Sequence, residues 1–332
     1  MVDIQALFDD IQNPSFSADQ TRFVAVTIPE YPHFHLAKDG EQSPSLLISI
    51  ADSTTKRSTA PITLEHLSVM FDVPCRINKS DGMSAEGIFT VIRCTGQERL
   101  LHTYFLRTLR LLFDLLPNAP TKKEVAQAVS TLVELFRSIL TPPRKSLQGL
   151  WAELLVIDCA MRPDLLVAAW HATPRDRFDF NAGYERLEVK STSQRVRQHH
   201  FALNQVIEIE DTKVLVASLF TEVVNNGTTI MELADNVRRK IEVYPDLVAH
   251  LDRIVITTLG ENWRMAYEEA FDKALALSSL RFYDVLSIPK IQLPLPTAVS
   301  DVHFRADLSS IEPFDLSQIS RNSELFSSFK KR

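Results

Sequence analysis

The chain has 332 residues, of which 45% are hydrophobic and 23% are charged, a composition typical of a globular protein with roughly two domains. Its formal net charge is −6, which argues against a protein that binds nucleic acid by itself through a broad basic surface. The 8 glycines form neither G-x-x-x-x-G-K-S/T nor G-x-G-x-x-G. Nucleotide-hydrolysing and dinucleotide-binding roles therefore have no support.

Residues 1–143 are predicted to form an N-terminal α+β domain. Strands are expected at 22–28, 45–50 and 87–94, and helices at 98–116 and from Thr121 to about Ile139. Glu124 lies three residues after Thr121, which is the spacing of a capping box. His33 and His35 share one face of an extended segment but lack a third metal ligand. With no catalytic motif, this half is interpreted as an interaction or specificity module.

A break at 141–145, Thr-Pro-Pro-Arg-Lys, separates this domain from a predicted core at 144–290. Ser146 can cap a helix that runs to about Met161 and is apolar nearly all round, which indicates burial on most sides. Glu153 lies within it. A glutamate in that position either forms a local salt bridge or has a functional role. The functional role is favoured because the helix leads directly into an acidic stretch of the chain.

That acidic stretch, residues 179–190, is predicted to form a hairpin that turns near Gly183. Side chains alternate between the faces of a strand, so Glu188 and Lys190 point the same way, and a hairpin can set Asp179 opposite them. Two carboxylates and an ammonium on one side are costly to bury without partners. A divalent cation and a phosphate would satisfy them, whereas exposed, salt-bridged strands would need neither.

In the rest of the chain, predicted helices and predicted strands alternate. We expect a helix or a strand at 201–206, a buried strand at 213–220, a turn at 225–227, helices at 229–241, 245–253 and 261–277, strands at 281–288 and 302–306, and an extended C-terminal segment at 291–332 that packs on the core. The three cysteines, Cys75, Cys94 and Cys159, are scattered singly, which argues against a disulfide framework or a structural zinc site. No apolar run approaches the ~20 residues that span a bilayer, and the first residues lack a secretory pattern. We therefore expect a cytoplasmic protein with no membrane partner.

A helix with Glu153, a strand with Asp179, a strand with Glu188-Val-Lys190 and a further strand follow one another in an order that resembles the PD-(D/E)xK nuclease superfamily. More closely, the chain is similar to a prokaryotic family of PD-(D/E)xK motif proteins associated with DNA-modification and phage-defence genes. The resemblance implies an α/β (mixed α+β) fold whose restriction-endonuclease-like core has a mixed central sheet flanked by helices. The usual proline of the motif is absent because Phe178 precedes Asp179, which leaves Asp176 as an alternative acid.

Residue by residue, the resemblance implies that Asp179 and Glu188 coordinate Mg²⁺, with Mn²⁺ as a substitute and the Val189 carbonyl as a further ligand. Glu153 matches the helix glutamate that many members place at the metal. Lys190 would orient or help deprotonate the attacking water and stabilise charge on the scissile phosphate.

Other residues have supporting parts in this interpretation. Gln205 matches a glutamine that some members carry after the lysine strand. The local basic patch contributes Arg195, Arg197, His199 and His200 as candidate contacts to the nucleic-acid backbone. The competing D-x-K, at Asp211 and Lys213, precedes its strand and follows no acidic hairpin.

These expectations describe a Mg²⁺-dependent DNA endonuclease of a bacterial restriction or phage-defence system. Its partners would be DNA and proteins of a defence or modification system, and the acidic net charge points to work inside an assembly or as a homodimer. One alternative is a catalytically inactive nuclease-like scaffold that binds DNA or partner proteins. Another is a nuclease of repair, recombination or RNA processing, which fold-level analogy does not separate from the first.

Overall fold

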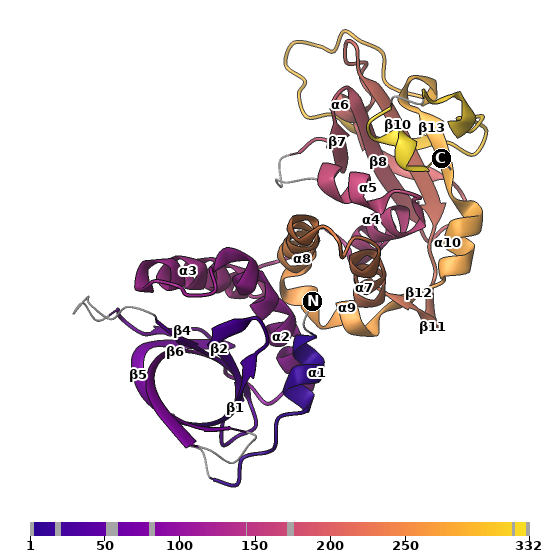
Figure 1. Cartoon of the computed structure of the whole chain (residues 1–332). Helices are drawn as coiled ribbons and strands as arrows, with labels where there is room; N and C mark the ends of the chain where they lie inside the picture. The colour runs from indigo at the N-terminus through magenta and orange to yellow at the C-terminus, as the bar shows by residue number, and fades with distance from the viewer. Residues whose placement is uncertain are drawn as a thin grey trace. The chain divides into compact units, whose positions relative to one another are not determined.

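The computed structural model describes residues 3–16, 21–50, 59–79, 84–143, 145–170, 176–320 and 323–329. Its internal contacts divide the chain into two units, Met1–Thr141 and Pro142–Arg332 (Figure 1). The division falls beside the boundary expected at 143/144. Both helices and sheets occur in each unit, so the fold is of the mixed α+β class.

The first unit is built on a closed sheet. Its strands are β1 (Arg22–Ile28), β2 (Tyr31–Lys38), β3 (Pro44–Ser49), β4 (Ile62–Thr63), β5 (Leu67–Lys79) and β6 (Ser84–Cys94). They follow the order β1-β2-β3-β6-β5-β4, and a parallel pairing of β1 with β5 closes five of them into a barrel. Buried side chains such as Phe23, Leu47 and Val91 fill its core. The strands expected at 22–28, 45–50 and 87–94 are confirmed, whereas β2 and most of β5 were not predicted.

Three helices complete this unit: α1 (Ile4–Asp9), α2 (Arg99–Leu115) and α3 (Lys122–Ser138). The predicted capping box is present, because the Glu124 carboxylate accepts the Thr121 N–H at 2.8 Å and the Thr121 hydroxyl accepts the Glu124 N–H at 3.4 Å. Helices α2 and α3 pack against each other, with Tyr104 and Phe136 in edge-to-face contact. The short α1 was not predicted.

The second unit has a four-stranded mixed sheet with the order β13-β10-β8-β7. These strands are β7 (Phe180–Ala182), β8 (Glu185–Thr192), β10 (Lys213–Phe220) and β13 (Arg281–Asp284). Strands β8 and β10 are parallel, while β7 and β13 are antiparallel to their neighbours. Strand β10 has the expected bounds and is buried along almost its whole length. Helix α4 (Leu147–Cys159) packs against β8, and Ser146 caps it as predicted.

The hairpin β7–β8 has a register that the sequence did not determine. Phe180 pairs with Leu187 and Ala182 pairs with Glu185, which leaves Gly183 and Tyr184 as the turn. Gly183 has a φ of +45°, a backbone conformation that glycine adopts without steric cost. The expectation that Asp179 lies within the strand was wrong by one residue, since β7 begins at Phe180.

The remaining elements of this unit surround the sheet. They are α5 (Pro163–Ala169), β9 (Gln198–Ala202), α6 (Leu203–Val206), β11 (Val223–Thr229), α7 (Ile230–Lys240), α8 (Pro245–Leu259), η1 (Gly260–Trp263), α9 (Met265–Glu268), β12 (Ala270–Phe271), α10 (Lys273–Ser279), η2 (Val285–Ser287), β14 (His303–Asp307), η3 (Leu316–Gln318) and η4 (Phe326–Phe329). The segment 201–206 is thus the end of a strand followed by a short helix. Strand β14 pairs with β9, which brings the C-terminal segment against the polypeptide between β8 and β10.

The turn expected at 225–227 falls within the bounds of β11, at a register shift where Val223 and Thr228 both pair with Phe271, and a side chain at Gly227 would collide with the backbone of Phe271. Two sequence expectations were wrong in this unit. The helix expected at 261–277 is broken into η1, α9 and α10 around the short strand β12. The strand expected at 281–288 ends at Asp284, whose carboxylate accepts the Leu286 N–H and begins η2. Among the helices of the described ranges, none combines the length and apolar character needed to cross a membrane.

Candidate functional site

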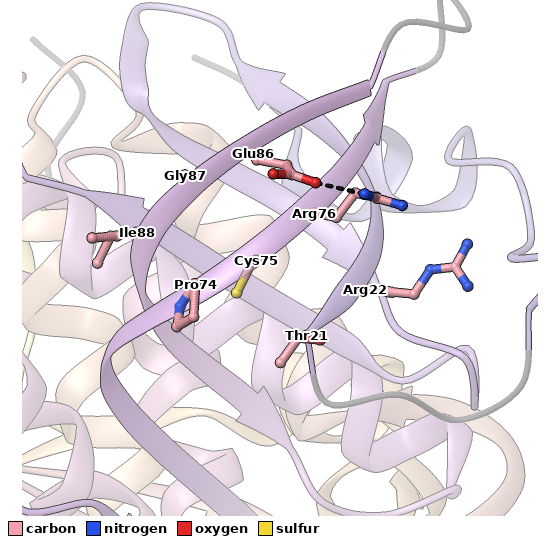
Figure 2. Close-up of a pocket in the computed structure, with 8 residues that line it drawn as sticks. All are labelled: Thr21, Arg22, Pro74, Cys75, Arg76, Glu86, Gly87 and Ile88. Carbon is pink, nitrogen blue, oxygen red and sulfur yellow. Dashed lines mark hydrogen bonds and ion pairs between the residues drawn. The ribbon is translucent and has the colours of Figure 1, made fainter.

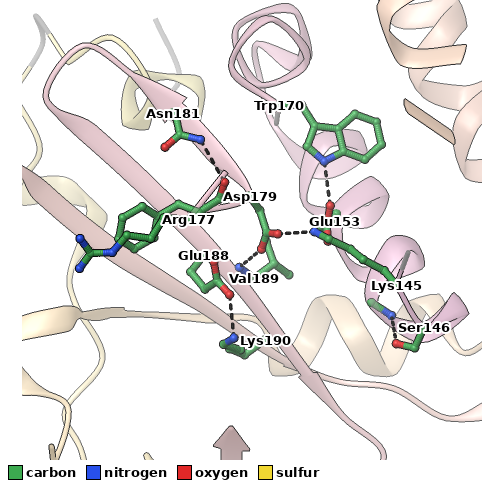
Figure 3. A network of polar contacts seen from close by, with 12 residues as sticks. Lys145, Ser146, Glu153, Trp170, Arg177, Asp179, Asn181, Glu188, Val189 and Lys190 are labelled. Carbon is green, nitrogen blue, oxygen red and sulfur yellow. Dashed lines mark hydrogen bonds and ion pairs between the residues drawn. The ribbon is translucent and has the colours of Figure 1, made fainter. Parts of the chain in front are cut away.

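A pocket of about 560 Å³ in the second unit collects the predicted acids (Figure 3). Its lining comes from the start of α4, the residues before β7, strand β8, α6 and α8: Lys145, Ser146, Gly149, Glu153, Asp176, Arg177, Phe178, Asp179, Glu188, Val189, Lys190, Gln205 and Thr258. The five residues predicted to be catalytic are all in this list. Segments as far apart in the sequence as Lys145 and Thr258 therefore meet at one cavity.

Glu153 projects into the pocket from the middle of α4 and exposes only 2% of its surface. Each of its carboxylate oxygens accepts a hydrogen bond, one from Lys145 Nζ at 2.5 Å and the other from Trp170 Nε1 at 2.8 Å. The Trp170 ring stacks on Phe180 at the start of β7, which fixes this donor against the sheet. Glu153 is thus held in one orientation by a cation and an indole.

Asp179 exposes 8% of its surface and is held from two sides. Its Oδ1 accepts a hydrogen bond from Lys145 Nζ at 2.5 Å, and its Oδ2 accepts the Val189 N–H at 2.8 Å. Burial and then the charges of Glu153 and Glu188 raise the pKa of Asp179 well above its ordinary value, although Lys145 opposes this shift. The charge of Lys145 therefore does not fully offset the effects of burial and of the neighbouring carboxylates on Asp179.

Among the residues that the structure describes, Lys145 is the side chain that bridges two of the acids, and the sequence analysis missed it. It lies in the break before α4, with 31% of its side chain exposed. Burial lowers its pKa, but the neighbouring charges of Glu153 and Asp179 and the hydrogen bonds to them raise it above the ordinary value for a lysine. A lysine in a loop has no periodicity or motif to mark it, so only the tertiary structure identifies it.

Glu188 forms a second polar cluster with Lys190 and Gln205. Its Oε1 accepts hydrogen bonds from Lys190 Nζ at 2.7 Å and from Gln205 Nε2 at 2.8 Å. Lys190 also donates to Gln205 Oε1 at 3.3 Å and lies over the Phe201 ring. Gln205 sits on α6 directly after β9, so the short helix brings the amide to the strand that carries both charges.

The donor set suits a hard cation in its chemistry. Carboxylate oxygens are preferred ligands of Mg²⁺, and three buried carboxylates line the pocket. Within the described ranges, however, no three or more His, Cys, Asp or Glu side chains converge as they stand to hold an ion. The two clusters explain why, because Glu153 and Asp179 share Lys145 while Glu188 is bound to Lys190 and Gln205.

The predicted basic patch divides into two pairs. Arg197 and His199 point inward: Arg197 donates to the Ser218 carbonyl at 2.8 Å and lies over the Phe220 ring, while His199 is 3% exposed with Nε2 2.8 Å from Ser218 Oγ. Their prediction as backbone contacts does not match these environments, because the alternation of β9 turns His199 into the core, and Arg197, which directly precedes β9, is held by Ser218. Burial, together with the charges of Lys190 and Arg197, lowers the pKa of His199 to about 4.

The other two members of the patch face outward. Arg195 is exposed and pairs with Glu222 at 2.5 Å. His200 is exposed on β9, and its Nε2 lies 3.1 Å from Arg305 Nη2 on the paired strand β14. Arg305 was not singled out from the sequence because more than 100 positions separate the two strands.

His200 and Arg305 line a polar groove of about 410 Å³ that shares Val189 and Lys190 with the acidic pocket. Its other lining residues are Gln148, Ser191, Thr192, Ser193, Gln194, Gln198 and His199. The groove therefore borders the pocket along β8. Any extended anionic molecule that entered the groove would meet Lys190 and Arg305 beside the acids.

The alternative motifs lie apart from this cluster. Asp176 is exposed at the rim of the pocket, whereas Asp179 is buried within it. Asp211 occupies a left-handed turn position, φ 55°, and Lys213 pairs with Asp284 on β13. The D-x-K competitor therefore does not assemble a site with the acids of the pocket.

A second pocket, also of about 560 Å³, lies in the barrel unit (Figure 2). It is lined by Thr21, Arg22, Pro74, Cys75, Arg76, Glu86, Gly87 and Ile88. Its carboxylate, Glu86, is exposed and pairs with Arg76 at 2.6 Å. This pocket lacks the buried acids that distinguish the one in the second unit.

A family model described as "Putative PD-(D/E)XK family member, (DUF4420)" matches residues 4–309. The match spans both units and includes every residue of the acidic pocket. Among curated proteins and among solved structures, nothing gives a significant match.

Proposed function

Because the chain belongs to this PD-(D/E)XK family, we propose that it is a metal-dependent DNA endonuclease of a bacterial restriction or phage-defence system. The observation that carries the proposal is the acidic pocket, where three buried carboxylates and Lys190 converge from α4, the start of β7 and β8. Such a concentration of buried charge is costly unless a bound cation and an anionic substrate use it. The parallel β8–β10 pair with a hairpin on β8 is consistent with a restriction-endonuclease-like core.

In this proposal Asp179 and Glu188 hold Mg²⁺ or Mn²⁺, with Glu153 beside them. The N–H and C=O of one strand residue point to the same edge of the strand, and the Val189 N–H faces Asp179, so the Val189 carbonyl is available as well. When bound, the ion would neutralise charge on the phosphate and make a water molecule more acidic. Because Lys145 bridges Glu153 and Asp179, these two acids can bind such an ion only if the Lys145 ammonium moves out of the space between them.

The other residues of the cluster act on the substrate and on one another. Lys190 provides a cation at the mouth of the pocket to orient the attacking water and to stabilise the scissile phosphate. Gln205 positions both Lys190 and Glu188 through its amide. Removing Gln205 would therefore weaken the function of Lys190 without removing either charge.

DNA would run along the groove lined by His200 and Arg305. Contacts of this kind position a nucleic-acid backbone without reading its sequence. Because the net charge is −6, a broad basic footprint is not available within the chain itself. Target recognition would then come from protein partners of the defence or modification system or from a second copy of the chain.

A second candidate function is a nuclease-like scaffold without catalysis. It is favoured by the salt bridges of Lys145 to Glu153 and Asp179, which neutralise two of the acids without any metal ion. A scaffold would bind DNA or partner proteins whether or not divalent cations are present. Dependence on a divalent cation therefore separates the two functions.

The test is cleavage of supercoiled plasmid by the purified full-length chain, alone and with the products of neighbouring genes, in Mg²⁺ and in EDTA. Glu188→Gln and Lys190→Ala are compared with wild type, and Glu86→Gln in the barrel pocket is the matched control. The proposal expects Mg²⁺-dependent nicking or linearisation that both site variants lose and that the control retains. Equal nicking by all four proteins, or none under any condition, would contradict an enzyme; selective cleavage of RNA would redirect the proposal to RNA processing.

A further inference from the structure

The inference concerns Lys145, which occupies the space between two carboxylates that a metal ion would need. Its Nζ lies 2.5 Å from Glu153 Oε1 and 2.5 Å from Asp179 Oδ1. Figure 3 shows the ammonium reaching from the residue before Ser146 into the pocket, between Glu153 on α4 and Asp179, which directly precedes β7. No other hydrogen bond of the ammonium is present among the described residues, so both of its bonds go to predicted metal ligands.

The charges explain why a cation belongs at this position. Glu153 and Asp179 are both buried, and burial, followed by the charges of Glu153 and Glu188, disfavours the ionised form of Asp179. Removing one partner of a buried ion pair leaves an uncompensated charge, which is strongly destabilising. Lys145 therefore stabilises the acidic pocket in the metal-free protein.

The attachment of Lys145 suggests that it can also leave. It lies before the first turn of α4, and the helix is capped by Ser146, whose hydroxyl accepts the Gly149 N–H at 3.1 Å. The helix start thus has its own hydrogen bond and does not require the Lys145 side chain. Lys190 is anchored differently, by Glu188, Gln205 and the Phe201 ring.

We propose that Lys145 is a positioning residue that serves as an exchangeable internal cation: it holds Glu153 and Asp179 in place until a divalent cation displaces its ammonium. The proposal rests on the proposed function, since it assigns the cation to the same acids. Displacement moves the ammonium, on its flexible four-carbon stem, toward the open mouth of the pocket. There it becomes available to a phosphate oxygen, so that binding of the cation and binding of the substrate are coupled.

The first measurement uses the wild-type full-length protein without DNA. Lysine amines are acetylated with an amine-reactive ester in EDTA and in saturating Mn²⁺, and mass spectrometry quantifies the modification of individual lysines. Lys145 is expected to react several-fold faster with Mn²⁺ than in EDTA. The half-buried Lys213, which pairs with Asp284 outside the acidic pocket, serves as the internal reference, and its reactivity should change less than that of Lys145.

The second measurement compares Mn²⁺ binding by isothermal titration calorimetry in wild type, Lys145→Ala and Asp179→Asn. Removal of a competing internal cation should tighten Mn²⁺ binding in Lys145→Ala by roughly 10-fold, within the range typical of coupled sites. The same variant should unfold several degrees lower than wild type in EDTA and recover most of the difference in Mn²⁺. Asp179→Asn should abolish the binding event.

The outcomes separate the two proposals. Unchanged Lys145 reactivity, together with equal Mn²⁺ affinities in wild type and Lys145→Ala, would overturn the exchange while leaving a metal-dependent enzyme intact. If wild type and Lys145→Ala both fail to bind Mn²⁺ at the acids, Asp179→Asn will behave like wild type. In that case both the proposed displacement of Lys145 and the proposed function fail. Increased reactivity of Lys145 in Mn²⁺ supports the exchange even if a Lys145 variant does not fold.

Discussion

The pocket of the barrel unit and the acidic pocket of the second unit have the same volume, about 560 Å³, but differ in how deeply their charged side chains are buried. In the barrel unit, Arg76 and Glu86 form an ion pair whose side chains are 55% and 70% exposed. In the second unit, Glu153 and Glu188 are 2% and 6% exposed and meet lysines inside the pocket. Exposed pairs cost little to form, whereas buried carboxylates must be compensated by nearby groups. Buried charge, and not cavity size, distinguishes the candidate site.

The largest effect that this comparison predicts concerns catalysis. Lys190→Ala should lower plasmid cleavage by roughly 10²–10⁴-fold, because it removes the cation that orients the water and the phosphate. The measurement is the initial rate of nicking in Mg²⁺, with Arg76→Ala in the barrel pocket as the matched loss of a cation. Similar losses in both variants would show that the buried cluster has no special part in cleavage.

A pH effect of smaller size comes from His199. Its ordinary pKa of 6.5 falls to about 4 in the folded protein, so between these values the unfolded chain binds a proton that the folded chain does not. Stability is therefore fully present above pH 6.5 and falls by up to about 3 kcal/mol as the pH drops to 4. Besides burial, the charges of Lys190 and Arg197 depress this pKa, and that of Asp307 opposes them.

All three tryptophans lie in the second unit, so their fluorescence during urea unfolding measures the stability of that unit. His199→Asn should flatten the acid-side slope. The control is His33→Asn in the barrel, where the half-buried imidazole also contacts a serine hydroxyl, at 3.0 Å. A slope that is the same in His199→Asn and in wild type would mean that the buried imidazole is not responsible.

Features that depend on residues close together in the sequence could be predicted from the sequence alone. The capping box at Thr121 depends on residues three positions apart, and it was found where expected. Glu153 on a buried helix and Glu188 on an alternating strand could also be located by local rules, whereas Asp179 lies one residue before its strand. Their function in the protein stays a prediction that the experiments above address.

Other features depend on contacts between distant residues, and these were missed. Lys145 bridges acids 8 and 34 positions away, and Arg305 meets His200 across 105 positions. Asn226 and Gly227 carry a local turn signal, but the sequence does not show that β11 continues on both sides of it by pairing Val223 and Thr228 with Phe271, whose backbone lies against Gly227. Local patterns do not contain such pairings, and only the tertiary fold supplies them.

A moderate effect on stability should follow from Asp179→Asn. The pKa of Asp179 is raised by burial and by the other carboxylates, so its charged form destabilises the metal-free protein once the pH exceeds the ordinary value. The asparagine amide retains an oxygen that can accept the Val189 N–H. The substitution should therefore raise the free energy of unfolding at neutral pH by roughly 0.5–2 kcal/mol, which is the usual range for a single stabilising substitution. Tryptophan-detected urea unfolding in EDTA measures it. A clear decrease in stability would show that the Lys145 bridge outweighs the repulsion.

The smallest effect is expected in the barrel pocket. Glu86→Ala removes the exposed partner of Arg76 and should change the stability of the barrel unit by only about 0.2–1 kcal/mol. Far-ultraviolet circular dichroism is the suitable probe because this unit contains no tryptophan. A larger loss would mean that the ion pair shapes the barrel, and the comparison between the two pockets would then lose its basis.

The central claim is that the buried acids of the second unit hold a divalent cation. Anomalous diffraction from crystals of the full-length protein soaked in Mn²⁺ tests it directly. We predict a peak within coordination distance of the carboxylates of Asp179 and Glu188, accompanied by movement of the Lys145 ammonium away from Asp179. Crystals with saturating Mn²⁺ that show no peak at these acids, and Lys145 still bridging Glu153 and Asp179, would contradict the claim.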